Sequence, residues 1–238
     1  MCATQYLFCR VFFTYCWIQI IEGYSAPYAR EKLKSAQIIP EVISEAPNVG
    51  IEIAYSEATR VDFGSQMTFD VVNVPPRVVK WPADESSLYT LIMTDPDVPC
   101  RKYPTQREWL HWLIANIPGN DLAKGETVCN YVGPQRIVGE GRFVFLVYKQ
   151  PDDRPKNYKE MKLEGSLHRL CWSVRGFAKN HSLGDPVAMN FFIIPEDPLE
   201  KEKEKERKMR IKMNKLRPPT LTTPSTTASY RDISLHPW

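Results

Sequence analysis

Two acidic side chains and one histidine have the types and spacing of a small binding site. Asp95 and Asp97 lie one residue apart in the segment DPDVPCR, whose two prolines fix backbone φ and remove amide donors. His111 follows between two tryptophans in the segment REWLHW. Because antiparallel strands bring the end of one near the start of the next, we expect a carboxylate to approach the imidazole, raise its pKa and favour a protonated donor. Such a donor between aromatic rings suits a small anion, of which phosphate is the commonest.

Simpler explanations exist for the same residues. DPDxP is a common turn in which Asp caps backbone amides and Pro stiffens the loop, and a single His in an apolar strand is often a hydrogen-bonded core residue. A hydrolase using Asp95 and His111 as an acid/base pair would also need an activated nucleophile and an oxyanion donor. Cys100 is near in sequence, but nothing identifies it as activated. Spacing alone leaves a binding site, a structural turn and an enzyme open.

Short apolar runs predict the strands that would position these residues. They are rich in aromatic and β-branched side chains and are bounded by Pro or Gly, which is typical of strands covered on both faces. The runs lie at 50–55, 71–74, 78–81, 89–94, 109–117, 143–148 and 189–194. Two helices are predicted, one at 29–39 before Pro40 and one at 163–179 that ends at 180–184. The pattern predicts a mainly β fold, an antiparallel sandwich or barrel with a few short helices.

Composition excludes several classes of protein. The chain has 238 residues, 43% hydrophobic and 25% charged, which is ordinary for a globular protein. Residues 201–217 hold nine Lys or Arg and three Glu, a local charge of +6, so the net charge of +3 leaves −3 for the rest. The body therefore has no general nucleic-acid surface. Six Cys and four His are scattered without the paired spacings of a structural zinc site, so no metal is expected.

The two ends differ from the body, which we place at residues 30–198. Residues 1–25 resemble a short secretory signal peptide, with an apolar run and small residues before a cleavage point after Ser25. Secretion is the preferred location, with an uncleaved leader on a cytoplasmic protein as the alternative. Asn180 begins a glycosylation sequon, Asn-His-Ser, so a secreted chain should carry a glycan there.

The segment 199–238 is predicted to be a basic tail that is disordered after about 217. Its charged part is at best a solvated helix, because Glu and Lys alternate without a wide apolar stripe. Peripheral contact with an anionic membrane through the basic residues is the alternative to a simply solvated extension. We favour the solvated extension, because the interspersed Glu dilutes the positive field.

Five segments in order carry a family resemblance. They are YTLIMTDPDVPCR, REWLHWLIANIPG, YVGP, GRFVFLVYKQ and LGDPVAMNFF. From about Ile38 to Phe192 the chain resembles the phosphatidylethanolamine-binding protein family. The resemblance implies an antiparallel β-sandwich with a small pocket for phosphorylated head groups or other small anions. It also implies a regulator of kinases or proteases, without a metal or an organic cofactor.

The resemblance also implies roles for individual residues. Asp95 and Asp97 match the paired carboxylates of the family motif, and Pro99 matches a proline that follows a cis peptide in similar proteins. Trp109 matches an aromatic wall of the pocket, and His111 matches its imidazole.

The chain departs from the family pattern where a second pocket histidine would stand. Gly141 is followed directly by Arg142, without the intervening Leu-His, and Phe143 stands in the place of a tyrosine. Two donors to a phosphate are thus missing, each worth roughly 1.5–3 kcal/mol. Arg136 or Arg142 could replace them, since a guanidinium holds phosphate with two parallel bonds. We therefore expect a non-catalytic ligand-binding regulator, with a scaffold whose pocket is vestigial as the main alternative and a hydrolase as the less favoured one.

Overall fold

The computed structural model describes residues 26–134, 139–152, 154–158 and 166–216. The described chain divides into two units, one that ends at Pro198 and a second that begins at Leu199. The predicted signal peptide and the end of the chain after Leu216 lie outside the described residues.

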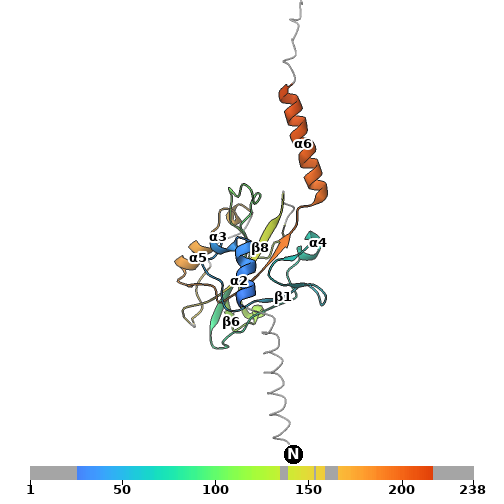
Figure 1. Cartoon of the computed structure of the whole chain (residues 1–238). Coiled ribbons are helices and arrows are strands. Elements are labelled where there is room, and N and C mark those ends of the chain that lie inside the picture. The colour runs from blue at the N-terminus through green and yellow to red at the C-terminus, as the bar shows by residue number, and fades with distance from the viewer. Residues whose placement is uncertain (1–25, 135–138, 153, 159–165, 217–238) are drawn as a thin grey trace, which may run out of the picture. The chain divides into compact units, whose positions relative to one another are not determined.

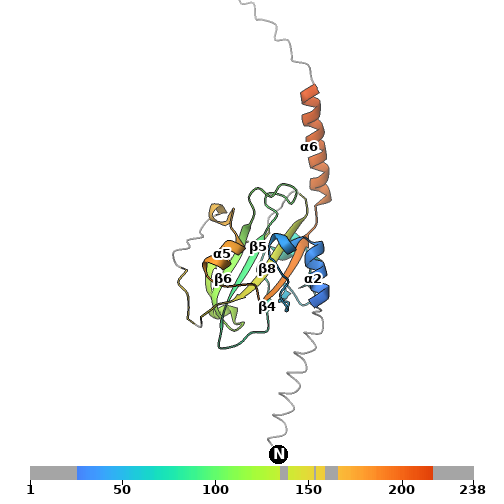
Figure 2. The same cartoon turned by 60° about the vertical axis from the view of Figure 1, so that its left-hand side comes forward.

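A six-stranded sheet forms the centre of the first unit and contains the four long apolar runs. Its strands lie in the order β3-β9-β8-β5-β6-β7. Their bounds are Ser65–Gln66 (β3), Leu88–Asp95 (β5), Trp109–Pro118 (β6), Glu126–Cys129 (β7), Gly141–Lys149 (β8) and Ala188–Ile194 (β9). Figure 2 shows β5 and β8 side by side in its middle.

The predicted antiparallel arrangement is correct for most of this sheet. Every neighbouring pair is antiparallel except β3 and β9, which run parallel, so the sheet is mixed. Parallel neighbours need a long connection, and β3 and β9 are separated by more than a hundred residues of intervening chain. Local patterning does not reveal a pairing between segments so far apart.

A smaller, three-stranded antiparallel sheet lies against one face of the large one. Its central strand is β1 (Glu52–Ala54), between β2 (Arg60–Val61) and β4 (Val78–Lys80) (Figure 1). Buried side chains from both sheets, among them Ile53, Trp81 and Phe145, form one apolar cluster. The two sheets therefore make a sandwich with this cluster inside.

Three short helices cover the other face of the large sheet. They are α2 (Ala26–Ser35), α3 (Ile38–Glu41) and α5 (Val174–Asn180). Along β8, Phe143 and Phe145 belong to the cluster between the sheets, whereas Val144 and Leu146 belong to a second cluster beneath the helices. Both faces of the strand are therefore buried, which confirms the prediction made from its continuous apolar run.

The sequence overestimated one helix. Residues 163–179 were predicted as a single helix, but in the described part Ser166–Arg169 forms a 3-10 turn and α5 begins only at Val174. Cys171 has a positive φ of 54°, and Ser173 is extended with its side chain accepting a hydrogen bond from the amide of Gly176. An N-cap serine begins a helix rather than continuing one, which explains the break.

Two other expectations need correction near the N-terminal half. The helix predicted at 29–39 begins at Ala26 and ends at Ser35, because Gln37 takes a left-handed conformation with φ of 57°. The apolar run at 71–74 is not a strand: the short helix α4 (Phe69–Val72) occupies its first half. The remaining short element is a 3-10 turn at Leu122–Lys124.

The second unit contains most of α6 (Pro198–Leu216). Its described side chains are exposed or half-buried, and Lys203, Lys205 and Lys208 pair with glutamates one turn earlier. This agrees with the solvated helix expected from the alternating charges. Among the described helices, none is long and apolar enough to span a membrane.

Candidate functional site

The end of β5 and the start of β6 position the residues singled out in the sequence. Asp95, the last residue of β5, lies opposite Trp109, the first residue of β6. The register shifts next to this pair: Thr94 faces Leu110, whereas Met93 faces Trp112. His111 is the extra residue at this bulge. A bulge redirects side chains, and here Leu110 lies beneath the helices while Trp112 lies between the sheets.

The imidazole of His111 is buried among aromatic rings. The residue is 2% exposed, and its ring meets those of Trp109 and Phe143 edge-on, at centroid distances of 4.4 and 5.3 Å. Its Nδ1 lies 2.6 Å from the carbonyl oxygen of Val132. Because a carbonyl oxygen only accepts, Nδ1 carries the proton. The other ring nitrogen, Nε2, is buried without a hydrogen-bond partner in the described structure.

The expected protonated imidazole is not what the structure shows. Burial, together with the nearby positive charge of Arg169, lowers the pKa of His111 to about 4, against the opposing effect of the Val132 carbonyl. The prediction was wrong because it relied on a neighbouring carboxylate. The carboxylate of Asp97 is instead paired with Arg142. At neutral pH His111 is therefore uncharged, with Nε2 as a hydrogen-bond acceptor.

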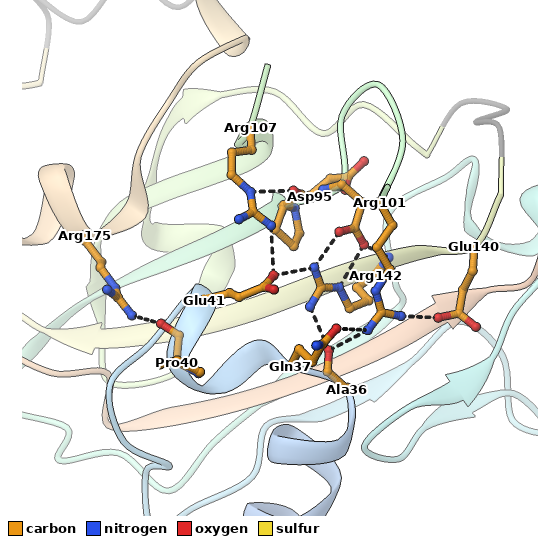
Figure 3. A network of polar contacts seen from close by, with 12 residues as sticks. Ala36, Gln37, Pro40, Glu41, Asp95, Arg101, Arg107, Glu140, Arg142 and Arg175 are labelled. Atoms are coloured by element: carbon orange, nitrogen blue, oxygen red, sulfur yellow. Dashed lines mark hydrogen bonds and ion pairs between the residues drawn. The ribbon is translucent and has the colours of Figure 1, made fainter. Parts of the chain in front are cut away.

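Arg142 lies in a buried network of polar contacts within the protein (Figure 3). Its Nε and Nη2 donate to the two carboxylate oxygens of Asp97 at 2.9 and 2.5 Å. Its Nη1 donates to the carbonyl of Ala36 at 2.7 Å, and Nη2 also donates to Glu41 at 2.8 Å. Both Arg142 and Asp97 are fully buried. Arg142 is thus not the replacement phosphate donor that the sequence suggested.

Other arginines connect the segment of helices α2 and α3 to the loop between β5 and β6 and to α5. Arg107 donates to the carbonyl of Pro96 and to Glu41, and Arg101 donates to the carbonyl of Ala36. Arg175, from α5, donates to the carbonyl of Pro40. Figure 3 shows these side chains converging on the chain between Ala36 and Glu41. The network orders the loop that follows Asp95 and contains Asp97. No local motif in the sequence predicted this network.

Two further carboxyl groups are buried beside the network. One oxygen of Asp95 accepts from the amide of Asp97 at 2.7 Å, and Glu108 accepts from the hydroxyl of Thr94 at 3.0 Å. Burial raises the pKa of each to about 7. For Asp95 the charges of Asp97 and Glu108 add to this effect, whereas the Asp97 amide and Arg142 oppose it. At neutral pH both groups are thus divided between the protonated and ionised forms.

Arg169 is a site residue that sequence reasoning missed. Its guanidinium lies over the Trp109 ring, 5.6 Å from the centroid. It also donates to the backbone carbonyls of Leu110, His111 and Asn130 at 2.9–3.1 Å. It stands within the segment predicted as a helix, so nothing in its sequence context indicated this role.

Two other residues predicted for the site, Pro99 and Phe143, lie in the described part of the chain. The Val98–Pro99 peptide is cis, as the resemblance implied. Phe143 is fully buried, stacks on Phe192 and forms a T-shaped contact with His111. Arg136 lies outside the described residues. In the described part, no three His, Cys, Asp or Glu side chains form a group that could hold a metal ion.

Comparison with known proteins identifies the family. Residues 46–192 match the family model described as phosphatidylethanolamine-binding protein. The chain belongs to this family. It is 35% identical over 165 residues to the "Putative odorant-binding protein A5" of Drosophila melanogaster, covering 68% of this chain and 78% of that protein.

Solved structures agree in fold. The phosphatidylethanolamine-binding protein from Plasmodium vivax is 24% identical with a TM-score of 0.61, over 70% of this chain and 97% of that one. A carboxypeptidase Y inhibitor, solved in complex with its cognate proteinase, is 22% identical with the same TM-score, over 72% and 96% of the two chains. The phosphatidylethanolamine-binding protein fold, with a mixed sheet and a few helices, is therefore established.

Proposed function

We propose that this protein is a non-catalytic binding module that holds a small ligand at His111 and regulates a protease or a kinase. The observation that carries the proposal is the buried, unpartnered Nε2 of His111, whose ring contacts those of Trp109 and Phe143. Buried polar atoms are normally hydrogen-bonded, so an exception calls for a missing partner. A phosphorylated head group or another small anion is the ligand class that the sequence predicts.

Regulation of a partner protein is supported at the level of the family. One relative of the same fold is an inhibitor of a carboxypeptidase, and its complex with that proteinase is known. We infer a protein partner of this kind for the present chain and prefer a regulator to a hydrolase. A direct measurement is the activity of carboxypeptidase Y with increasing amounts of the purified chain.

Replacing His111 by alanine tests the ligand site. We expect it to weaken binding of at least one of two probes, phosphoethanolamine and benzyl alcohol, by tenfold or more, measured by calorimetry on the full chain. The matched control is His181→Ala, since His181 packs on Phe177 at the end of α5, outside the site. Thermal unfolding checks that both variants fold. The absence of binding by both probes, or an equal loss in both variants, would contradict the proposal.

Secretion is proposed from the leader and from Asn180. Asn180 is the last residue of α5 and is exposed, so an oligosaccharide could be attached without unfolding the helix. On expression in eukaryotic cells we expect one glycan at Asn180 and a mature N-terminus near Ala26. Intact-mass analysis before and after glycosidase treatment, with N-terminal sequencing, measures both. Unglycosylated protein that retains Met1 and stays in the cytosol would refute secretion without affecting the ligand proposal.

A further inference from the structure

The charged donors described at the site are already used by the protein itself. The Arg142 guanidinium is bonded to Asp97, Glu41 and the carbonyl of Ala36. Arg169 donates to three backbone carbonyls and covers the Trp109 ring. Among the described residues, an anion placed at His111 would therefore find no uncommitted guanidinium unless one of these bonds broke.

The uncharged imidazole also disfavours an anion. With the proton on Nδ1, Nε2 presents a lone pair, which repels a phosphate oxygen and attracts a hydrogen-bond donor. Converting Nε2 to a donor requires protonation, which burial and Arg169 oppose. An anionic ligand would thus lose more hydration than the site could restore.

A cationic ligand group is disfavoured for a related reason. The positive charge of Arg169 lowers the affinity of Nε2 for a proton. The same charge would repel any other cation placed beside Nε2. An uncharged donor meets neither difficulty. The imidazole of His111 itself lies against two aromatic rings, those of Trp109 and Phe143.

We propose that the ligand group bound at His111 is an uncharged hydroxyl, from an alcohol or a phenol, that donates its hydrogen bond to Nε2 while the apolar part of the ligand contacts Trp109 and Phe143. This inference rests on the proposed function and specifies its ligand class. Phe143 favours such a ligand because it has no hydroxyl. A tyrosine at this position would add a polar group of the protein itself beside the rings of His111 and Trp109.

Three probes of similar size separate the possibilities. Benzyl alcohol has the hydroxyl, ethylbenzene lacks it, and phenyl phosphate replaces it with an anion. By calorimetry on the full chain at pH 7.5, we expect benzyl alcohol to bind at least tenfold more tightly than either of the others. In ¹⁵N spectra, the Nε2 resonance of His111 should shift on addition of benzyl alcohol, and that of His181 should not.

A variant identifies the acceptor. His111→Phe keeps an aromatic ring but removes Nε2, so benzyl alcohol should bind it no better than ethylbenzene does, whereas His181→Phe should keep the tenfold preference. If His111→Phe does not fold, the Nε2 shift in the unmodified chain decides the question.

Two results would overturn the inference in different ways. Tighter binding of phenyl phosphate, with a shift at His111, would refute the hydroxyl ligand but retain the proposed function. If no probe binds and Nε2 is hydrogen-bonded only to a buried water, the hydroxyl inference is refuted. If phosphoethanolamine also fails to bind, the proposed ligand site is refuted with it.

Discussion

Replacing Arg142 by alanine should lower the free energy of unfolding by about 3–5 kcal/mol, because it leaves a buried carboxylate without its partner. Arg142 and Asp97 are both fully buried, and their side chains are joined by two hydrogen bonds. The carbonyl of Ala36 loses its donor in the same change. Urea unfolding followed by tryptophan fluorescence measures the loss.

An exposed ion pair provides the matched control for this prediction. Arg60 pairs with Glu52 at 2.6 Å, but 60% of the Arg60 side chain is exposed. Arg60→Ala should therefore cost no more than about 1 kcal/mol. An equally small effect of Arg142→Ala would mean that the buried network does not stabilise the fold.

A double variant separates two causes of the destabilisation: the loss of the attraction between Arg142 and Asp97, and the burial of an Asp97 carboxylate without a partner. In Arg142→Met combined with Asp97→Leu, no buried carboxylate remains at position 97, so part of the lost stability should return relative to Arg142→Met alone. The recovery should be incomplete, since Asp97 also accepts from the backbone amide of Arg142, and Ala36 loses a donor. Greater loss in the double variant than in Arg142→Met would contradict this explanation.

The free energy of unfolding of Asp95→Asn minus that of the natural chain should increase with pH. The pKa of Asp95 is raised to about 7 in the folded protein, against about 3.9 in an unfolded chain. Between these two pH values Asp95 is protonated in the folded state but ionised in the unfolded state. The contribution of Asp95 to the free energy of unfolding is therefore complete below about pH 4 and is lost as pH rises through 7. Three pH units correspond to roughly 4 kcal/mol, an order-of-magnitude figure. Asparagine does not titrate and should not show this loss.

Other groups at the site must be separated from this effect. The pKa of Glu108 is also raised, so the stability that Glu108 contributes to the fold is likewise lost as pH rises. His111 acts oppositely, because its lowered pKa stabilises the fold above about pH 6.5 and that contribution is lost as pH falls toward 4. The difference between Asp95→Asn and the natural chain, measured by urea unfolding at pH 4.5, 6 and 8, removes both to first order.

The control for the pH experiment is an exposed aspartate. Asp62→Asn makes the same chemical change at a carboxylate that is exposed and lies outside the core. Parallel profiles for Asp95→Asn and the natural chain would show that Asp95 titrates as an exposed group does.

Local patterns in the sequence were sufficient to predict much of the fold. The continuous apolar runs that became β5, β6, β8 and β9 indicated strands buried on both faces, because that environment places apolar side chains at every position. The motif around Asp95 and Pro99 located the loop between β5 and β6. The family resemblance then implied the sandwich, and comparison with known proteins confirmed the family.

The chemistry of the site depended on contacts between distant parts of the chain. Arg142 stands beside Phe143 in sequence, but its partners include Ala36 and Glu41, about a hundred residues earlier. The protonation of His111 was decided by burial and by Arg169, which is 58 positions away. By itself the sequence determined which residue types lie at the end of β5 and the start of β6. Only the tertiary structure decided which charges are neutralised and which nitrogen is left to bind a ligand, because solvation and charge pairing are properties of the surrounding volume, not of neighbours in sequence.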